Sequence, residues 1–230
     1  MSKIVVIHQP DFLPYLGFFH RLLYADLFVV LDNVQFVKAG WHHRDKIKTR
    51  NGEQWLTVSV KKAPTETNIN QMLLFEGEGF RKRHLNLLSI NYGKSEFYEE
   101  VISHLNRLYS YECSKLADFN MKSLEILMEL FAIDIEYIFA GNINAQGIGG
   151  NEINVDILRK TDATHYLSGL GALNYHRQEP YRDAGLEVVF QNFKHPVYPQ
   201  QFGDFIPYLS SIDLLFNCGI EKSREILRSI

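Results

Sequence analysis

The chain has 230 residues, a formal net charge of −3 and a hydrophobic fraction of 46%. This length and apolar content suffice for one sizeable core, so we expect a single domain over residues 1–230. The slightly acidic balance gives no electrostatic reason to expect nucleic acid as a partner.

The two cysteines and the N-terminus indicate the compartment. Cys113 and Cys218 show no metal-type spacing, and two thiols make no disulfide framework. The start of the chain lacks the basic and apolar regions of a signal peptide, and its apolar run Ile4–Ile7 is too short to span a bilayer. We therefore expect a reducing, cytoplasmic location and no direct membrane insertion.

The first elements along the chain predict a βαβ unit. The β-branched run Lys3–Ile7 is typical of a strand buried on both faces. Pro10 and Pro14 exclude a regular helix between them. Phe18–Tyr24 then predicts a short helix and Asp26–Leu31 a second buried strand, so the two strands should be parallel with a right-handed crossover.

A β-hairpin insert is expected at residues 41–75. Asn51-Gly52 is the strongest short hairpin signal in the chain, and it predicts that Asp45–Thr49 pairs with Gln54–Val60. A helical segment follows at residues 79–132, where apolar residues recur at helical spacing. Its expected helices are Phe80–Tyr92, Glu96–Tyr109 and Ser114–Phe131, with Ser114 as a candidate cap.

Strands and helices alternate in the rest of the chain. The expected strands are Glu136–Ala140, Thr164–Leu167 and Leu186–Gln191, and the expected helices are Asn154–Lys160, Tyr175–Asp183 and one from Ile212 onward. This alternation favours an α/β fold. We expect a Rossmann-like three-layer domain with a mainly parallel sheet, the β-hairpin insert and the helical insertion.

Polar residues follow both of the first two strands: His8, Gln9, Asp11, Asp32, Asn33 and Gln35. In open α/β sheets ligands bind beyond the carboxyl ends of the strands, so these side chains predict a site at one sheet edge. The two prolines would hold the first loop stiff before a ligand arrives. The alternative is that both aspartates cap turns and His8 is a core histidine.

A glycine turn directly after the predicted strand Thr164–Leu167 is a candidate phosphate site. Ser168, Gly169 and Gly171 lie between a predicted strand and a helix-like segment, where backbone N–H groups can approach an anion. Ser168 lacks the surroundings of a nucleophile elbow, so it is expected to hydrogen-bond a ligand. The alternative is that Gly169 and Gly171 are ordinary turn glycines without a ligand. Tyr175 is a further candidate for substrate binding.

Three more groups of residues are candidates for substrate binding. His195, Tyr198 and Gln200 lie in the proline-rich run HPVYPQ, where Tyr198 can stack on a sugar or base unless the run is a packed surface turn. Asn217 stands four residues after Asp213, and the pair either reaches the site or braces the tail. The last group is Trp41, His43 and Arg44, with a charged hairpin arm as its alternative.

Four stretches resemble the WbqC-like family in order along the chain. They are IHQPDFLPYLGFFHRLLYADLFVVLDNVQF, THYLSGLGALNY, HPVYPQ and LSSIDLLFNCG. The resemblance implies a bacterial cytoplasmic protein of O-antigen (lipopolysaccharide) and other surface-polysaccharide pathways, described as a transferase on sugars. His42-His43-Arg44 departs from the family, which more often has an amide before the arginine, and this puts the role of His43 in doubt.

The resemblance therefore implies a transferase, in its most concrete form one that moves an acyl or aminoacyl group onto the amine of a nucleotide-linked amino sugar. His8 would be the base, Asp11 or Asp32 would orient it, and an amide side chain would stabilise the oxyanion. The alternatives are a glycosyltransferase on a nucleotide-sugar donor, with Asp11 or Asp32 as base, and a non-catalytic sugar-nucleotide-binding or assembly protein. We expect no metal and no cofactor; the partners are a nucleotide-activated sugar and an acyl or glycosyl donor, and an oligomer is possible.

Overall fold

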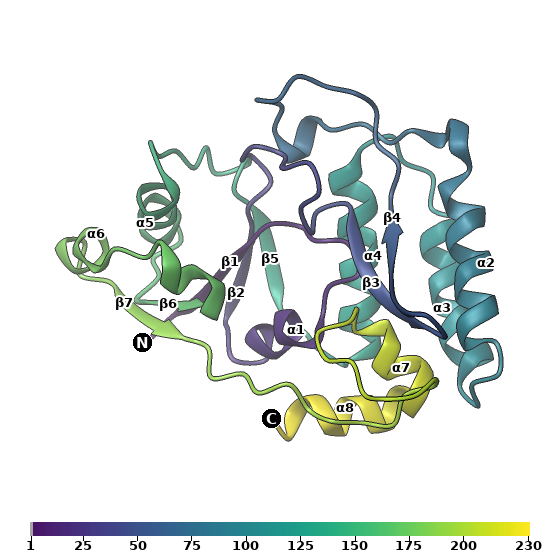
Figure 1. Ribbon diagram of the computed structural model, residues 1–230. Helices are drawn as coiled ribbons and strands as arrows, with labels where there is room; N and C mark the ends of the chain where they lie inside the picture. The colour runs from purple at the N-terminus through teal and green to yellow at the C-terminus, as the bar shows by residue number, and fades with distance from the viewer. Residues whose placement is uncertain (1) are drawn as a thin grey trace. The chain divides into compact units, whose positions relative to one another are not determined.

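The computed structural model describes residues 2–230, and its backbone divides into two compact units (Figure 1). The first unit comprises the residues up to Gln9, His20–Val34 and Asp134–Phe193, and the second comprises Pro10–Phe19, Gln35–Ile133 and Lys194–Ile230. The single domain over residues 1–230 stays a prediction.

The first unit is built on a five-stranded parallel sheet with strand order β5-β2-β1-β6-β7. Its strands are β1 (Ile4–His8), β2 (Leu27–Val30), β5 (Glu136–Phe139), β6 (His165–Ser168) and β7 (Glu187–Phe190). The parallel pairing of β1 with β2 confirms the predicted βαβ unit, whose connection contains α1 (Leu16–Leu22). The α/β, Rossmann-like fold class is therefore confirmed.

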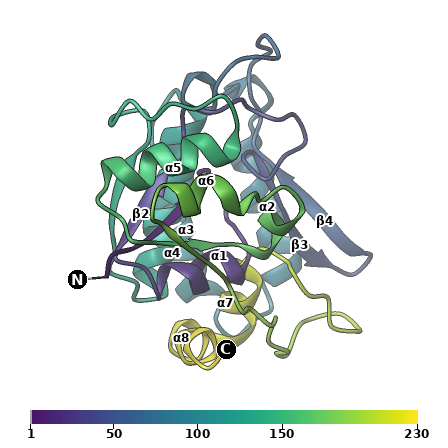
Figure 2. The same ribbon diagram turned by 90° about the vertical axis from the view of Figure 1, so that its left-hand side faces the viewer.

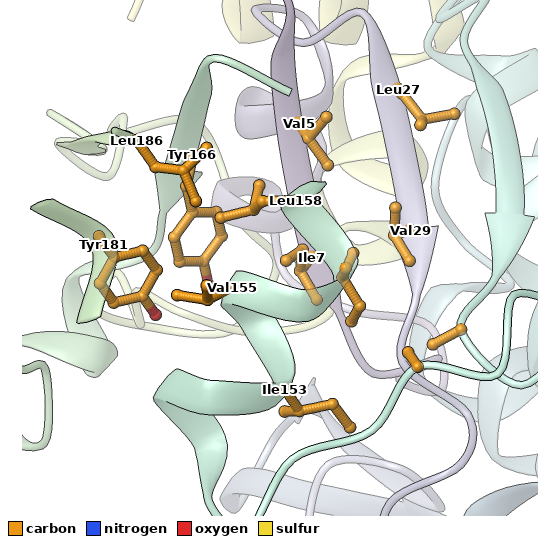
Figure 3. Packing of buried hydrophobic residues seen from close by; sticks show 13 residues of the cluster. Val5, Ile7, Leu27, Val29, Ile153, Val155, Leu158, Tyr166, Tyr181 and Leu186 are labelled. Atoms are coloured by element: carbon orange, nitrogen blue, oxygen red, sulfur yellow. The ribbon is translucent and has the colours of Figure 1, made fainter. Parts of the chain in front are cut away.

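Side chains from one face of this sheet form an apolar core with α5 (Gly150–Lys160) and α6 (Gln178–Asp183). Alternate residues of β1 and β2, such as Val5, Ile7 and Val29, point toward Val155 and Leu158 of α5 (Figure 3). Figure 2 views the unit from the side of these two helices. All four residues of β2 are buried, as expected of a strand covered on both faces.

The second unit combines a hairpin with helices. Strands β3 (Arg44–Thr49) and β4 (Gly52–Thr57) pair antiparallel. The helices are α2 (Phe80–Tyr92), α3 (Tyr98–Tyr109), α4 (Leu116–Leu130), α7 (Ile212–Cys218) and α8 (Ile220–Arg228), with short 3₁₀ turns η1 (Ile69–Gln71) and η2 (Glu76–Glu78). The expected hairpin and helical segment are thus both present.

Two local predictions differ from the structure. Thr49 pairs with Gly52, so the hairpin loop is Arg50-Asn51 and not Asn51-Gly52; the Thr49 hydroxyl accepts a bond from Asn51 N at 3.1 Å and fixes this earlier turn. Ser114 does not cap α4, because Lys115 occupies the N-cap position; the Ser114 carbonyl accepts from Leu74 N at 2.9 Å.

The C-terminal helix is interrupted, which the sequence did not indicate. Gly219 separates α7 from α8 with φ of 75° and ψ of 170°, a conformation open almost only to glycine. A Cβ atom at this position would lie 2.6 Å from the ring of Phe97. Among residues 2–230, no helix is both long and apolar enough to cross a bilayer.

Candidate functional site

The strand order reverses between β1 and β6 in the first unit. The chain runs from β1 outward through β2 and β5, then returns to place β6 on the other side of β1 (Figure 1). Ligands of open α/β sheets bind at the carboxyl ends of strands at such a switch point. The two strands that flank it are in register at Val5 and Tyr166 and end at His8 and Ser168.

His8 is half-buried at the carboxyl end of β1. Its Nδ1 lies 2.9 Å from the carbonyl oxygen of Gln9. A carbonyl only accepts hydrogen bonds, so Nδ1 carries the proton and the lone pair of the neutral ring is on Nε2. The backbone of Gln9 thereby sets His8 in the tautomer that can take up a proton through Nε2.

Asp32 and Asn33 follow β2 at the same edge of the sheet. Asp32 is 7% exposed, and its Oδ1 accepts a bond from Gly141 N at 2.9 Å. The Asn33 amide donates to the carbonyl oxygen of Ala145 at 2.9 Å. Both side chains therefore hold the loop after β5, which favours the turn-bracing alternative for these bonds. A further role toward a ligand stays a prediction.

Gly169 follows β6 directly and lies against Arg21. A Cβ atom on Gly169 would be 3.2 Å from Nη1 and 3.3 Å from Cζ of Arg21, so the absence of a side chain lets the guanidinium approach the turn. Arg21 is only 3% exposed, and Ser168 is fully buried. A buried positive charge therefore lies beside the predicted phosphate turn. Arg21 was not predicted, because nothing in the sequence distinguishes it from any other arginine on a short helix.

Gln191 and His20 extend this group of polar residues. Gln191 comes directly after β7; its N–H donates to Ser168 O at 2.8 Å, and its side-chain nitrogen lies 2.9 Å from Nδ1 of His20. Both residues are at most 5% exposed. Neither was predicted, yet a polar residue at the end of a strand is the same signal that identified His8.

The remaining predicted residues of this unit are less enclosed. Gly171 is exposed in the 3₁₀ turn η3 (Leu170–Asn174), and the side chain of Tyr175 is 65% exposed. The carbonyl oxygen of Tyr175 accepts from the Asn151 amide at 3.1 Å, which ties η3 to α5.

Nine predicted residues belong to the second unit: Asp11, Gln35, Trp41, His43, Arg44, His195, Tyr198, Gln200 and Asn217. The structure therefore divides the predicted constellation between two units. Gln35 donates to Thr65 O at 2.8 Å, and Nδ1 of His195 lies 2.8 Å from Pro196 O. Burial lowers the pKa of His195.

Asp11 lies in a buried polar cluster near the start of β3. Its Oδ1 is 3.4 Å from Nδ1 of His42, and both residues are buried. Burial lowers the pKa of His43 to about 4, with smaller contributions from the charges of Arg44 and His42. Burial, reinforced by the charge of Asp11, raises the pKa of Asp45 well above its usual value. Low dielectric surroundings thus favour the neutral forms of His43 and Asp45.

Tyr198, Gln200 and Asn217 converge on Asp213, which is fully buried. The Tyr198 hydroxyl and the Gln200 amide donate to Asp213 Oδ2 at 2.9 Å and 2.8 Å. The Asn217 amide donates to Asp213 O at 2.7 Å. These contacts favour the bracing alternative, and ligand binding by the three residues stays a prediction.

Two partners of this network gave no sequence signal. Tyr92 donates to Asp213 Oδ1 at 2.7 Å, and Lys48 donates to Gln200 Oε1 at 3.1 Å. Within residues 2–230, no three His, Cys, Asp or Glu side chains are grouped as a metal site requires.

Comparisons with known proteins cover nearly the whole chain. The WbqC-like protein family matches residues 9–225. The chain is 28% identical over 224 residues to "Uncharacterized protein Rv1507c" of Mycobacterium tuberculosis, an alignment that spans 96% of each chain. No solved structure matches the chain significantly. The chain therefore belongs to the WbqC-like protein family, a membership that suggests a role in polysaccharide biosynthesis.

Proposed function

We propose that this protein is a transferase of bacterial cell-surface polysaccharide biosynthesis. It moves an acyl or aminoacyl group onto the amine of a nucleotide-linked amino sugar. The observation that carries the proposal is the set of polar side chains at the switch point of the parallel sheet. His8, Ser168 and the turn at Gly169 end the two strands where α/β folds bind their ligands.

His8 is the base of the proposed reaction. The sugar ammonium must lose a proton before its nitrogen becomes nucleophilic, and Nε2 of His8 has the lone pair that accepts it. The amine then forms an N–C bond with the acyl carbonyl carbon, whose π pair moves onto oxygen. Collapse of this oxyanion breaks the bond to the leaving group, which departs with the electron pair and takes the proton from His8. The freed Nε2 of His8 then takes the second proton from the nitrogen, which leaves a neutral amide.

The positive charge of Arg21 suits the diphosphate of the sugar nucleotide. Its guanidinium lies against Gly169, in the turn whose backbone N–H groups are the predicted phosphate contacts. The Asn33 amide, from the neighbouring strand end, is a candidate donor to the oxyanion. Asp32 accepts a bond from Gly141 N and so fixes the loop after β5, at the edge of the sheet where His8 lies.

The test compares two histidines of the same sheet. His8→Ala should lower the transfer rate by about 10²–10⁴-fold and leave the affinity for the sugar nucleotide nearly unchanged. His165→Ala is the matched control, because His165 begins β6 at the opposite edge and pairs there with Glu187 at 3.1 Å. Transfer is followed by mass spectrometry of a panel of nucleotide-linked amino sugars with acyl-thioester and aminoacyl donors.

Two outcomes would overturn the proposal. Equal activity of His8→Ala and His165→Ala would exclude His8 as the base. Release of free nucleoside diphosphate from the sugar nucleotide, without an acylated product, would identify glycosyl transfer instead.

A further inference from the structure

The two tryptophans of the sequence lie together in the second unit, Trp55 on β4 of the hairpin and Trp41 in the segment that leads into β3. Trp41 is 49% exposed and Trp55 is 36% exposed, and their ring centroids are 5.4 Å apart at an interplanar angle of 47°. Indole side chains are normally largely buried, so two exposed neighbours leave an unusual apolar surface in water. An exposed aromatic pair of this kind is typical of a binding surface.

Two cations border the exposed indoles. The guanidinium carbon of Arg44 lies 4.1 Å from the Trp55 ring centroid, and Lys46 Nζ lies 5.1 Å from it. Lys46 and Trp55 are directly paired across the strands, and Arg44 is two residues before Lys46, so the three side chains share one face of the hairpin. We call Trp41, Arg44, Lys46 and Trp55 the hairpin platform.

Buried residues on the opposite face of the hairpin support the hairpin platform. Asp45, Ile47 and Leu56 on the opposite face are at most 3% exposed. Trp41 O accepts from Phe12 N at 3.1 Å, which fixes the segment that leads into β3. The aromatic and cationic groups are therefore arranged before any ligand arrives.

Arg44 has donors to spare for a ligand. One of its terminal nitrogens donates to Ala39 O, and this is its one hydrogen bond to the part of the chain that the structure describes. A guanidinium carries five N–H groups, so it can also bind two oxygens of an anion. Lys46 differs, since it is paired with Glu53 at 2.5 Å.

We propose that the hairpin platform is a binding site for a saccharide ring that carries an anionic group. The apolar ring face lies on Trp41, and the phosphate or carboxylate oxygens bind Arg44. The chemistry requires both parts, because an aromatic surface selects a flat apolar ring face and the guanidinium selects an oxyanion. The proposal does not depend on the transferase reaction, because it rests on residues of the second unit alone.

Tryptophan fluorescence tests this directly, because both fluorophores belong to the hairpin platform. Glucosamine 1-phosphate and glucuronic acid should each change the emission of the full chain in a saturable way. Neutral N-acetylglucosamine and inorganic phosphate, each of which has only one of the two required parts, should bind at least tenfold more weakly. Isothermal titration with the same four probes provides a second readout that does not depend on the fluorophores.

Matched variants separate the two contributions. Arg44→Gln should weaken binding of both anionic sugars about tenfold or more, since a charge-assisted bond is lost. Arg50→Gln, at the exposed tip of the same hairpin, should leave binding unchanged. Trp41→Ala should also weaken binding, whereas Trp55→Phe keeps an aromatic ring and the Trp41 reporter. The urea midpoint of each variant checks that the hairpin remains folded.

Three results would overturn the proposal. They are no saturable binding of either anionic sugar by both methods, equal affinity for inorganic phosphate and glucosamine 1-phosphate, or an equal loss in Arg44→Gln and Arg50→Gln. The His8→Ala chain should bind these probes like the wild type, so a failure of the transferase proposal leaves this result intact.

Discussion

Polar residues of the same types are used differently at the switch point of the first unit and around Asp213 in the second. His8 is half-buried, stands at a strand end, and has Nδ1 oriented by the carbonyl of the next residue. Asp213 is fully buried, and its two oxygens accept bonds from Tyr92, Tyr198 and Gln200. Multiple protein donors to a buried group indicate a structural role, whereas a strand-end group with partial exposure is suited to a ligand.

The comparison also explains why His8 and Gln200 were both candidate site residues, one as the base and one for substrate binding. Each is a polar residue within two positions of a proline, and that pattern alone does not reveal which partners fold around it. Substitutions at these residues test the difference, because loss of a structural residue should lower the free energy of unfolding and loss of a residue suited to a ligand should not.

The largest effect is expected from Asp213→Leu. This change leaves the hydroxyls of Tyr92 and Tyr198 and the nearby Lys48 ammonium without their buried acceptor or counter-charge. Removal of one partner of a buried charged network costs about 3–5 kcal/mol. Urea unfolding measures the loss, and Asp183→Leu at an exposed position of α6 is the control. A loss below about 1 kcal/mol would contradict a structural role for Asp213.

A second, pH-dependent effect is expected from His84. Burial lowers the pKa of His84 to about 4, while its Nε2 lies 2.9 Å from the carbonyl of Thr57. The unfolded chain takes up this proton near pH 6.5 and the folded chain does not. Stability is therefore fully present above pH 6.5 and is lost as the pH falls toward 4, by up to about 3 kcal/mol.

The check is the free energy of unfolding between pH 7 and pH 4.5, measured for the wild type and His84→Gln. The variant should lose less stability on acidification, because the excluded proton is no longer required. His43, whose pKa is also about 4, makes the same contribution to the pH dependence of the free energy of unfolding in both proteins. Identical slopes would show that His84 does not titrate abnormally.

A smaller loss is expected from Gln200→Ala. The amide of Gln200 bonds Ile206 O at 2.9 Å and Asp213, and its oxygen accepts from Ile206 N and Lys48. Loss of these partners should destabilise the protein by about 1–3 kcal/mol. Gln201→Ala serves as the neighbouring control in the same urea experiment. The affinity for a sugar nucleotide should not change, and a selective loss of affinity at unchanged stability would return Gln200 to the ligand site.

The smallest effect on stability is expected from His8→Gln. The ring is half-buried, and its hydrogen bond through Nδ1 is to the adjacent residue. We expect a change within about 0.5 kcal/mol in thermal unfolding, as for substitutions away from packed or charged cores. A destabilisation as large as that of Asp213→Leu would identify His8 as a core residue, the alternative that its sequence position left open.

Local composition was sufficient to predict the elements of the sheet. Short β-branched runs such as Lys3–Ile7 are typical of buried strands, and their alternation with helices favours parallel pairing. The position directly after those runs made His8 and Asp32 candidate site residues, because the same local pattern predicts where the strands end. The resemblance of long stretches to a family was likewise readable without coordinates, and the match over residues 9–225 confirms it.

Only the tertiary structure decided which polar residues have their hydrogen bonds satisfied by other groups of the protein. Lys48 and Tyr92 lie 121 or more residues from some of their partners in the Asp213 network, and no local pattern encodes such contacts. Arg21 is equally hidden in the sequence, since an arginine on a short helix normally faces solvent. Burial and long-range hydrogen bonding arise when distant segments pack, and they convert the same residue type into a brace or a binding group.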